Sequence, residues 1–358
     1  MTVRHSTPAA GEGALAWPCR VLVTGGNGFI AQHTIAVLLE EGYHVVTTVR
    51  SEEKVDAVRK THNGHGDLTI VVVGDITSAD AYLAGLQNET IHAILHLAAP
   101  FTYATQSFET DLMIPSVQGA EAALHLAEQL GVKRVVQTNS FACIYDASLG
   151  PRPDKIYSAK DWAPLTYDDG VRAKDAPTAY RASKVAAERA AWDFMKQSRC
   201  FDLVSLCPGM VFGPWLDAPT TVKSINTSNM LVYNVVSLPE EESVPPTKAP
   251  VWVHVRDVAR AHVQALRIPE AGGKRFLLAT NVYCNQEIAD VAREVIPPAM
   301  RKGRVPVGQL GKREHRTHFG IDVQETLGIL GLQWTDLGTC LRELVPQLYA
   351  IQDEGSKV

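Results

Sequence analysis

The chain has 358 residues, 46% of them hydrophobic, and its 34 lysines and arginines against 39 aspartates and glutamates leave a net charge of −5. A net negative chain without a block of lysines and arginines is not expected to bind nucleic acid, because neutralising phosphates requires a concentrated basic surface. The longest uncharged apolar stretch, residues 203–216, is too short to span a bilayer and is broken by prolines and glycines, so no membrane segment is expected. The six cysteines are scattered and the N-terminal tail holds no secretory apolar region. We therefore expect reduced thiols in a cytoplasmic protein.

Short β-rich runs alternate with helical patterns over the first 210 residues. Most of the runs are continuously apolar, which is typical of strands buried on both faces of a parallel sheet covered by helices. We predict an α/β protein with a Rossmann-type doubly wound parallel sheet and a smaller C-terminal substrate lobe. The predicted strands are Arg20–Thr24, His44–Arg50, Leu68–Val73, Ile91–Leu97, Arg134–Ser140 and Leu203–Cys207, and the predicted helices are Phe29–Glu41, Ser78–Leu86, Phe108–Leu130 and Thr178–Gln197.

The pattern of composition divides the chain into four parts. Residues 1–17 form an N-terminal tail, and residues 18–207 form the dinucleotide-binding domain, with a long excursion at 146–177 that is rich in proline, aspartate and lysine. Residues 208–350 are mainly the substrate-binding lobe, with some segments returning to the sheet, and residues 351–358 are a C-terminal tail. Long loops in compact domains are commonly functional, so the excursion is expected near the site.

The first predicted strand runs into a glycine-rich turn that opens a helix. Gly25 permits the tight turn, Gly28 lets backbone N–H groups approach a pyrophosphate, and Ala31 keeps the helix close to the sheet. The alternative is an ordinary strand-to-helix turn, but the flanking strand and helix favour a dinucleotide site. The residues expected to bind the cofactor here are Gly25, Asn27, Gly28, Phe29 and Ile30.

The second predicted strand ends at Arg50, and Lys54 follows one helical turn later. This strand end faces the adenosine ribose, where NAD would require an acidic residue and where an arginine provides a planar fork for the extra phosphate of NADP. A solvated arginine is the alternative. The coincidence of the fork with a second cation favours NADP(H) as the cofactor.

Two further strand ends supply candidate cofactor contacts. Asp75 either accepts a hydrogen bond from the adenine amino group or caps a turn, and Ile76 could pack on the adenine ring. Leu97, Ala98 and Ala99 are small or apolar residues that leave space for the cofactor, although they also suit plain packing. Neither segment decides between its alternatives.

The residues expected to be catalytic are Ser140, Tyr180 and Lys184. Ser140 ends a buried strand at the carboxyl edge of the sheet, where ligands bind in open α/β folds. Tyr180 and Lys184 are four residues apart on a predicted helix and so share one face. A phenol has a pKa of about 10, and a neighbouring ammonium favours its ionised form, which suits the phenol for proton transfer. Ser140 would donate a hydrogen bond to the substrate oxygen, where negative charge grows as hydride arrives.

The chain resembles an extended short-chain dehydrogenase/reductase, in the branch of the dihydroflavonol reductases and the methylglyoxal or aldehyde reductases. The resemblance covers roughly residues 18–350 and rests on motifs in family order: Thr24-Gly25-x-x-Gly28-Phe29-Ile30-Ala31, Thr48-Val49-Arg50, His96-Leu97-Ala98-Ala99-Pro100, Arg134-Val135-Val136-x-Thr138-x-Ser140, Tyr180-x-x-x-Lys184 with Ala187-Glu188-x-Ala190-Ala191-Trp192, Pro208-x-x-Val211-x-Gly213-Pro214 and Val255-Arg256-Asp257-Val258-Ala259-x-Ala261-His262.

That resemblance implies a Ser-Tyr-Lys triad and NADPH-dependent reduction of carbonyl groups. It also implies cofactor contacts from Thr138, Pro208, Met210 and Val211, in addition to Tyr180 and Lys184. The family usually has Thr-Ser-Ser where this chain has Thr138-Asn139-Ser140, so the catalytic serine is retained and its neighbour differs.

Aromatic and apolar residues past the strand ends suggest the substrate class. Such a cleft would suit an apolar or aromatic small-molecule carbonyl compound, although these side chains are core packing as often as pocket wall. The histidine pairs lack supporting ligands, so no metal is expected, and the sequence leaves a monomer or a homodimer open. The candidate substrate residues are Phe101, Phe141, Tyr145, Met210 and Trp215.

Two alternatives to the reductase remain at this stage. A sugar-nucleotide epimerase or dehydratase shares the fold and the triad, but it recycles a retained NAD and would prefer an acidic residue in place of Arg50. A regulator that senses the dinucleotide without chemistry would have no use for the serine, tyrosine and lysine together.

Overall fold

The computed structural model describes residues 19–87, 89–99, 106–198, 200–248, 250–313 and 318–355. The N-terminal tail predicted at 1–17 and the candidate substrate residue Phe101 lie outside these ranges. None of the helices in the described ranges combines the length and the apolar character that crossing a membrane requires. The six cysteines are free thiols, and Cys200 is the exposed one among them.

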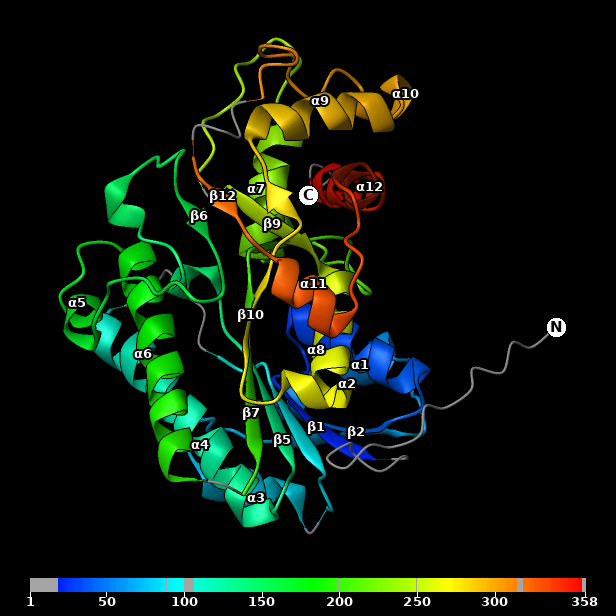
Figure 1. The fold of residues 1–358 in the computed structure, drawn as a ribbon. Helices are drawn as coiled ribbons and strands as arrows, with labels where there is room; N and C mark the ends of the chain where they lie inside the picture. Colours follow the sequence, from blue (N-terminus) through cyan, green and yellow to red (C-terminus); the bar gives the residue numbers. More distant parts are fainter. Residues whose placement is uncertain are drawn as a thin grey trace.

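A seven-stranded sheet forms the centre of the molecule (Figure 1). Its order is β10-β7-β5-β4-β1-β2-β3, and every neighbouring pair is parallel. The chain order reverses between β1 and β4, which is the switch point of a doubly wound sheet and the place where such folds bind ligands. The predicted Rossmann-type sheet is therefore confirmed.

Helices cover both faces of the sheet because its strands are apolar on both sides. Val21, Val23 and Val136 pack towards α1 and α8 on one face, whereas Leu22 and Val135 pack towards α3, α4 and α6 on the other. Successive side chains of a strand point to opposite faces, so a continuous apolar run fills both layers. Figure 1 shows α4 and α6 on one side of the sheet and α1 and α8 on the other.

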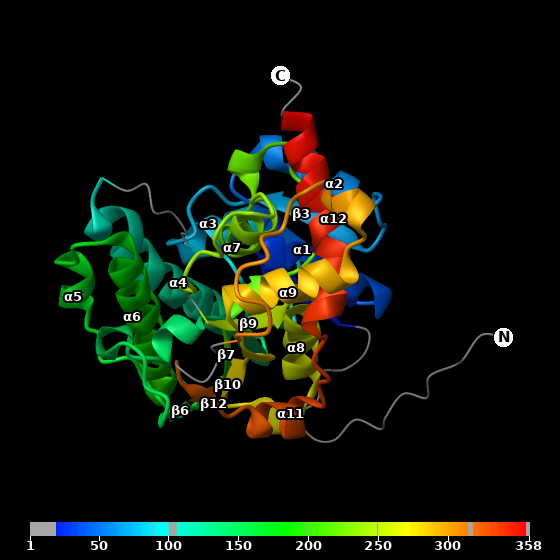
Figure 2. The same cartoon turned by 90° about the horizontal axis from the view of Figure 1, so that it is seen from above.

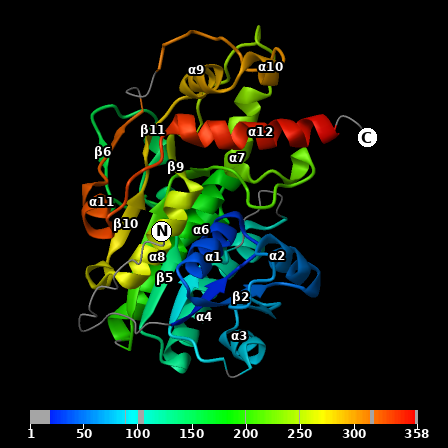
Figure 3. The ribbon, with the colours of Figure 1, turned by 90° about the vertical axis from the view of Figure 1, so that its right-hand side faces the viewer.

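A second lobe follows the strand β7 and packs above the carboxyl edge of the sheet. It contains a three-stranded sheet of order β11-β9-β8 and a core formed largely by α7, α9 and α12. Figure 2 shows α9 and α12 next to each other, and Figure 3 shows α12 running across the molecule below α9 and above the sheet with its helices. The chain then returns to the main sheet, where β10 pairs with β7.

The long excursion is tied down by a short strand. Its residues Ile156–Tyr157 form β6, which pairs in parallel with Gly320–Ile321, the strand β12. A short helix, α5, stands between this strand and α6. The excursion is thereby joined to the C-terminal part of the chain.

The predicted elements of the first 210 residues agree with the structure to within a few residues, with two differences. The strand β3 is not fully buried at any of its five residues, because it is the edge of the sheet. The predicted helix 108–130 begins with a π-helical segment, Glu109–Met113, before α4, since Pro115 in the first turn of α4 lacks an N–H donor.

The strands are β1 (Arg20–Thr24), β2 (His44–Val49), β3 (Leu68–Val72), β4 (Ala93–His96), β5 (Arg134–Thr138), β6 (Ile156–Tyr157), β7 (Asp202–Pro208), β8 (Met210–Phe212), β9 (Val251–His254), β10 (Arg275–Leu278), β11 (Asn281–Val282) and β12 (Gly320–Ile321). The helices are α1 (Phe29–Glu40), α2 (Val55–Thr61), α3 (Ala79–Leu86), α4 (Ile114–Leu130), α5 (Tyr167–Val171), α6 (Ala176–Gln197), α7 (Thr227–Val236), α8 (Val255–Arg267), α9 (Asn285–Val295), α10 (Pro298–Arg301), α11 (Gln324–Leu330) and α12 (Leu337–Gly355).

Candidate active site

A cleft of about 550 Å³ opens at the carboxyl edge of the sheet, between the two lobes. Its wall comes from the turn between β1 and α1, the ends of β4 and β5, the start of α6, the segment from β7 to β8 and the start of α7. The lining residues are Gly25, Gly28, Phe29, Ile30, Ala31, Leu97, Thr138, Asn139, Ser140, Phe141, Ala142, Tyr145, Pro177, Tyr180, Arg181, Pro208, Gly209, Met210, Val211, Asn226, Thr227, Ser228, Leu231, Lys248, Pro250 and Val251.

The glycine turn is shaped by close contacts. Gly25 has a φ of +73°, which glycine adopts at little cost, and its N–H donates to Thr48 Oγ1 at 3.1 Å. A Cβ added at Gly26 would overlap the side chain of Thr47, so this position also requires glycine. The requirement at Gly26 was not anticipated from the sequence, because it depends on the packing of β2 against the turn.

The start of α1 fits an anionic group. Gly28 is the N-cap of the helix and makes no side-chain cap hydrogen bond, so the N–H groups of the first turn are left for a ligand. The positive end of the helix dipole points at the same place. Together with the glycine turn, where an added Cβ at Gly25 or Gly26 would crowd Ala98 or Thr47, this start of the helix fits the pyrophosphate of a dinucleotide. Asn27 is exposed at the tip of the turn and is not part of the cleft wall.

Thr24 joins the ends of β1 and β4 beneath this turn. Its buried hydroxyl oxygen accepts hydrogen bonds from the N–H groups of Leu97 and Ala98, at 3.0 and 2.9 Å. Thr24 Oγ1 also lies 3.1 Å from His96 Nδ1. Burial, reinforced by Lys184, lowers the pKa of His96 to about 4, so the ring is neutral.

The residues predicted at the adenosine end lie outside the cleft wall. Arg50 and Lys54 are exposed beside the end of β2. Asp75 Oδ1 accepts from the hydroxyl and the N–H of Thr77, at 2.6 and 2.8 Å, and these bonds lower the pKa of the carboxyl. One oxygen of Asp75 therefore serves a turn, which was one of its two predicted roles. The remaining predicted residues here, Ile76, Ala98 and Ala99, are half-buried.

Ser140 and Tyr180 line the same cleft as the glycine turn. Ser140 Oγ accepts from the N–H of Ala142 at 3.1 Å, which turns its oxygen towards the start of a short 3-10 helix. Lys184 is buried behind the phenol, with its Nζ 6.0 Å from the centre of the Tyr180 ring. The helix α6 carries both residues, and it begins with Asp175, whose carboxylate accepts from the N–H of Thr178 at 2.8 Å.

The environment of Lys184 is mixed in charge. Burial lowers the pKa of its ammonium, and Cys143, Cys207 and Glu188 act in the opposite direction. The two thiols remain protonated because burial raises their own pKa, so Glu188 is the anion of the group. Glu188 is fully buried and forms a two-point ion pair with Arg275, with both N–O distances 2.8 Å.

Thr138 is paired with a histidine of α8. Its Oγ1 lies 2.6 Å from His262 Nε2, and His262 Nδ1 lies 2.7 Å from the carbonyl oxygen of Val258. His262 is fully buried. His262 belongs to the motif at residues 255–262, from which no role for its side chain could be predicted.

The predicted substrate residues divide into two groups. Phe141, Tyr145 and Met210 line the cleft, and the rings of Phe141 and Tyr145 are stacked with centroids 5.0 Å apart. Trp215 is not part of the cleft wall and packs instead on Phe29, with ring centroids 6.0 Å apart. Pro208 and Val211, predicted as cofactor contacts, line the cleft as well.

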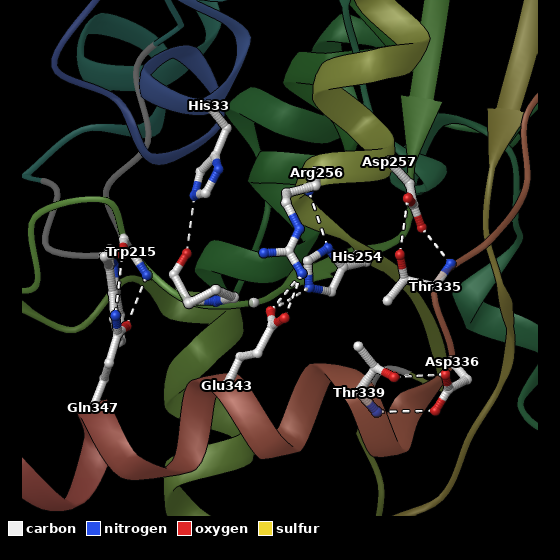
Figure 4. Close-up of polar contacts among 12 residues, drawn as sticks. His33, Trp215, His254, Arg256, Asp257, Thr335, Asp336, Thr339, Glu343 and Gln347 are labelled. Atoms are coloured by element: carbon white, nitrogen blue, oxygen red, sulfur yellow. Dashed lines mark hydrogen bonds and ion pairs between the residues drawn. The ribbon is translucent and has the colours of Figure 1, made fainter. Parts of the chain in front are cut away.

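Polar contacts hold the segment that carries Trp215 (Figure 4). Its N–H donates to Gln347 Oε1 at 2.8 Å, and Gln347 Nε2 donates back to its carbonyl oxygen at 3.1 Å. His33 of α1 lies 2.9 Å, through Nε2, from the carbonyl oxygen of Pro214. Arg256 and Glu343 form an ion pair next to these contacts. Side chains of the helices α1 and α12 therefore hydrogen-bond to this segment from two sides.

Several residues of the cleft wall were not anticipated from the sequence. They lie in loops or near helix starts and belong to no recognisable motif. They are Pro177 and Arg181 of α6, Asn226 and Ser228 at the start of α7, and Lys248. Among the described residues, no group of three or more histidines, cysteines, aspartates or glutamates could hold a metal ion.

Comparison with known proteins identifies relatives over most of the chain. The model of the NAD dependent epimerase/dehydratase family matches residues 21–279. The chain is 33% identical over 336 residues to a ketoreductase of Aspergillus niger, which covers 92% of this chain and 97% of that protein. It is 32% identical over 338 residues to the NADPH-dependent methylglyoxal reductase GRE2 of Saccharomyces cerevisiae, with 92% and 97% covered.

The solved structures agree with these relatives. The crystal structure of yeast methylglyoxal/isovaleraldehyde reductase complexed with NADPH matches with a TM-score of 0.86 and 31% identity, over 94% of this chain and 99% of that one. The resemblance drawn from the motifs is confirmed: the chain belongs to the NAD dependent epimerase/dehydratase family, among the extended short-chain dehydrogenases/reductases.

Proposed function

We propose that this chain is an NADPH-dependent oxidoreductase that reduces a ketone or aldehyde carbonyl group of an apolar or aromatic small molecule. Ser140, Tyr180 and Lys184 carry the reaction. The observation that supports this most directly is that one cleft is lined by the glycine turn, by Ser140 and by Tyr180, with Lys184 behind the phenol. The similar ketoreductase and NADPH-dependent methylglyoxal reductase support carbonyl reduction and the choice of cofactor.

Each part of the cofactor would be held by a different group of this chain's residues. The glycine turn and the start of α1 bind the pyrophosphate, and Arg50 with Lys54 bind the phosphate on the adenosine ribose. Lys184 would bind the ribose at the nicotinamide end, and Pro208, Met210 and Val211 would contact the nicotinamide. The cofactor supplies the hydride.

Tyr180 supplies the proton that completes the reduction. The phenol of Tyr180 transfers its proton to the carbonyl oxygen, which takes up the π electrons as the carbon gains the hydride that the cofactor would supply, and the product is an alcohol. The Lys184 ammonium stabilises the phenolate that remains. Ser140 donates to the same oxygen, since its Oγ already accepts from Ala142 and no acceptor for its hydrogen is found within the described ranges.

The character of the cleft wall supports the substrate class. Phe29, Leu97, Phe141, Tyr145 and Met210 give it a largely apolar surface, and no aspartate or glutamate of the described residues lines it. A flat apolar or aromatic carbonyl compound gains by leaving water for such a surface.

The experiment that tests the proposal is turnover with a panel of ketones and aldehydes, followed by the loss of NADPH absorbance, in wild type and Tyr180→Phe. The variant is expected to lose roughly 10²- to 10⁴-fold in kcat, while NADPH affinity changes little, because the lost group acts on a proton. Tyr145→Phe is the matched control, since it removes a phenol oxygen from the same cleft without touching the triad, and it should retain most of the turnover.

Two results would reverse the proposal. Normal turnover of Tyr180→Phe would remove this residue from the acid role. Protein that carries tightly held NAD and shows no preference for NADPH would favour an epimerase or dehydratase instead.

A further inference from the structure

Two buried histidines bond to threonines at the carboxyl edge of the sheet. His96 ends β4 and pairs with Thr24 at the end of the neighbouring strand β1, where His96 Nδ1 lies 3.1 Å from Thr24 Oγ1. His262 reaches from α8 to the end of β5, where it meets Thr138 at 2.6 Å. Both threonines end strands that flank the cofactor side of the cleft.

The direction of the hydrogen bond between Thr138 and His262 follows from the other nitrogen of the ring. The carbonyl oxygen of Val258 can only accept, so His262 Nδ1 carries a hydrogen and donates to it at 2.7 Å. Burial lowers the pKa of His262 to about 4, so the ring is neutral and Nε2 has no hydrogen. Thr138 must therefore donate its only hydroxyl hydrogen to Nε2.

The hydroxyl oxygens of the two threonines differ in whether the protein supplies a hydrogen-bond donor to them. The oxygen of Thr24 accepts from the N–H groups of Leu97 and Ala98, so the protein uses its lone pairs. Thr138 lines the cleft, and no N–H or O–H from the described part of the chain donates to its hydroxyl oxygen. Its side chain is thus left as a hydrogen-bond acceptor, with a donor still missing.

We propose that His262 is a positioning residue that holds the Thr138 hydroxyl as an acceptor for a hydrogen-bond donor at the nicotinamide end of the cofactor, either its carboxamide N–H or a ribose O–H. The inference rests on the proposed NADPH function. It gives His262, the last residue of the motif 255–262, a role in binding through Thr138, although the histidine itself does not line the cleft.

The test is the dissociation constant for NADPH, measured by fluorescence without a carbonyl substrate. His262→Asn places an amide nitrogen near the position of Nδ1, so it keeps the bond to Val258 and loses the acceptor for Thr138. It is expected to weaken NADPH binding roughly tenfold, the effect of one lost hydrogen bond. His262→Gln places an amide oxygen near the position of Nε2 and should restore most of the affinity.

Changes at Thr138 complete the set. Thr138→Val removes the hydroxyl at constant shape and is expected to weaken binding as much as His262→Asn, whereas Thr138→Ser keeps the hydroxyl and the affinity. Because His262 acts through Thr138, the double variant Thr138→Val with His262→Asn should bind no more weakly than Thr138→Val alone.

Fragments of the cofactor locate the donor. 2′-Phospho-ADP, which lacks the nicotinamide and its ribose, should bind all variants as it binds wild type. 2′-Phospho-ADP-ribose adds that ribose without the base: weaker binding by His262→Asn identifies a ribose hydroxyl, and unchanged binding identifies the carboxamide.

The proposal is overturned if His262→Asn binds NADPH like wild type, if the two changes add in the double variant, or if 2′-phospho-ADP is weakened as much as NADPH. The last result would mean that the histidine only maintains the fold. Wild-type protein that fails to bind NADPH would contradict the proposed function, which separates that failure from a failure of this inference.

Discussion

Arg50 is the residue on which the choice between the two nicotinamide cofactors depends. It is exposed beside the end of β2, and Lys54 follows in the short helical turn after it. Neither residue lines the cleft around Ser140 and Tyr180, so both would act on the distant adenosine end of the ligand.

Arg50→Ser is expected to raise the dissociation constant for NADPH roughly 10- to 100-fold and to leave that for NADH unchanged. The reason is that an arginine–phosphate pair is a charge-assisted hydrogen bond of about 1.5–3 kcal/mol, and NADH lacks the phosphate. Fluorescence titration with both cofactors measures the effect. Arg59→Ser, which removes another exposed arginine one helix further on, is the control, and equal losses for NADPH and NADH would contradict the assignment.

At the scale of residues, the sequence predicts those site residues that stand at strand ends or share a helix face. Ser140 and Tyr180 meet because the end of β5 and the start of α6, the helix that precedes the next strand of the sheet, lie at the same carboxyl edge. The pair of Thr138 and His262 could not be predicted, since its partners are 124 residues apart and meet only through the packing of α8 on the sheet. The position of Trp215 likewise depends on Phe29 and on the distant Gln347.

The helix α6 is the element that joins the candidate catalytic residues to the interior. Tyr180, Lys184 and Glu188 follow each other at intervals of one turn along it, from the cleft to the fully buried Glu188, which forms an ion pair with Arg275. Arg275 also donates to carbonyl oxygens of the long excursion, and its guanidinium stacks on Trp162 at 3.9 Å. One ion pair therefore fixes α6, β10 and the excursion together.

Glu188→Gln is expected to lower the free energy of unfolding by roughly 3–5 kcal/mol, because it leaves the buried guanidinium of Arg275 without its counter-charge. Replacing both residues, as Glu188→Leu with Arg275→Met, should cost less than the single change. Urea denaturation followed by tryptophan fluorescence measures both. Glu325→Gln breaks the exposed pair with Lys274 and should change stability by less than about 1 kcal/mol. A Glu188→Gln protein as stable as wild type would refute the role of the pair.

At the scale of elements, periodicity predicts most of the alternating strands and helices of the first lobe, but it does not predict the short helix α2 (Val55–Thr61). The start of α6 is marked by Asp175 as a cap and by Pro177 in its first turn, so its position is local information. The strand β10 gives no such signal, because its place in the sheet is decided by pairing with β7 after a long detour of the chain. The short strands β6 and β12 are too brief for any periodicity to reveal them.

The whole molecule buries an unusual set of neutral histidines. Burial lowers the pKa of four of them to about 4 and that of the fifth, His254, to about 3. In the unfolded chain a histidine has a pKa of about 6.5, so between about pH 4 and 6.5 the unfolded state binds more protons than the folded one. The four histidines whose pKa is lowered to about 4 are His33, His62, His96 and His262.

Stability is therefore expected to fall as the pH falls from 6.5 towards 4, by up to roughly 1.4 kcal/mol per pH unit for each of these histidines. Thermal unfolding at pH 7, 6 and 5 measures the slope. His254→Asn should make the slope shallower, since asparagine can still cap α8 but does not titrate in this range. A melting temperature that is constant over this range would contradict the expectation.

The return of β10 to the main sheet has a consequence for how the protein is made. On the ribosome, β7 emerges long before β10, and in the meantime one apolar edge of the sheet has no partner. The second lobe, β8, β9 and α7 among its parts, must leave the exit tunnel before that edge is closed. A nascent chain released at residue 207 would thus present an open strand to its neighbours, and the two lobes complete their folding only together.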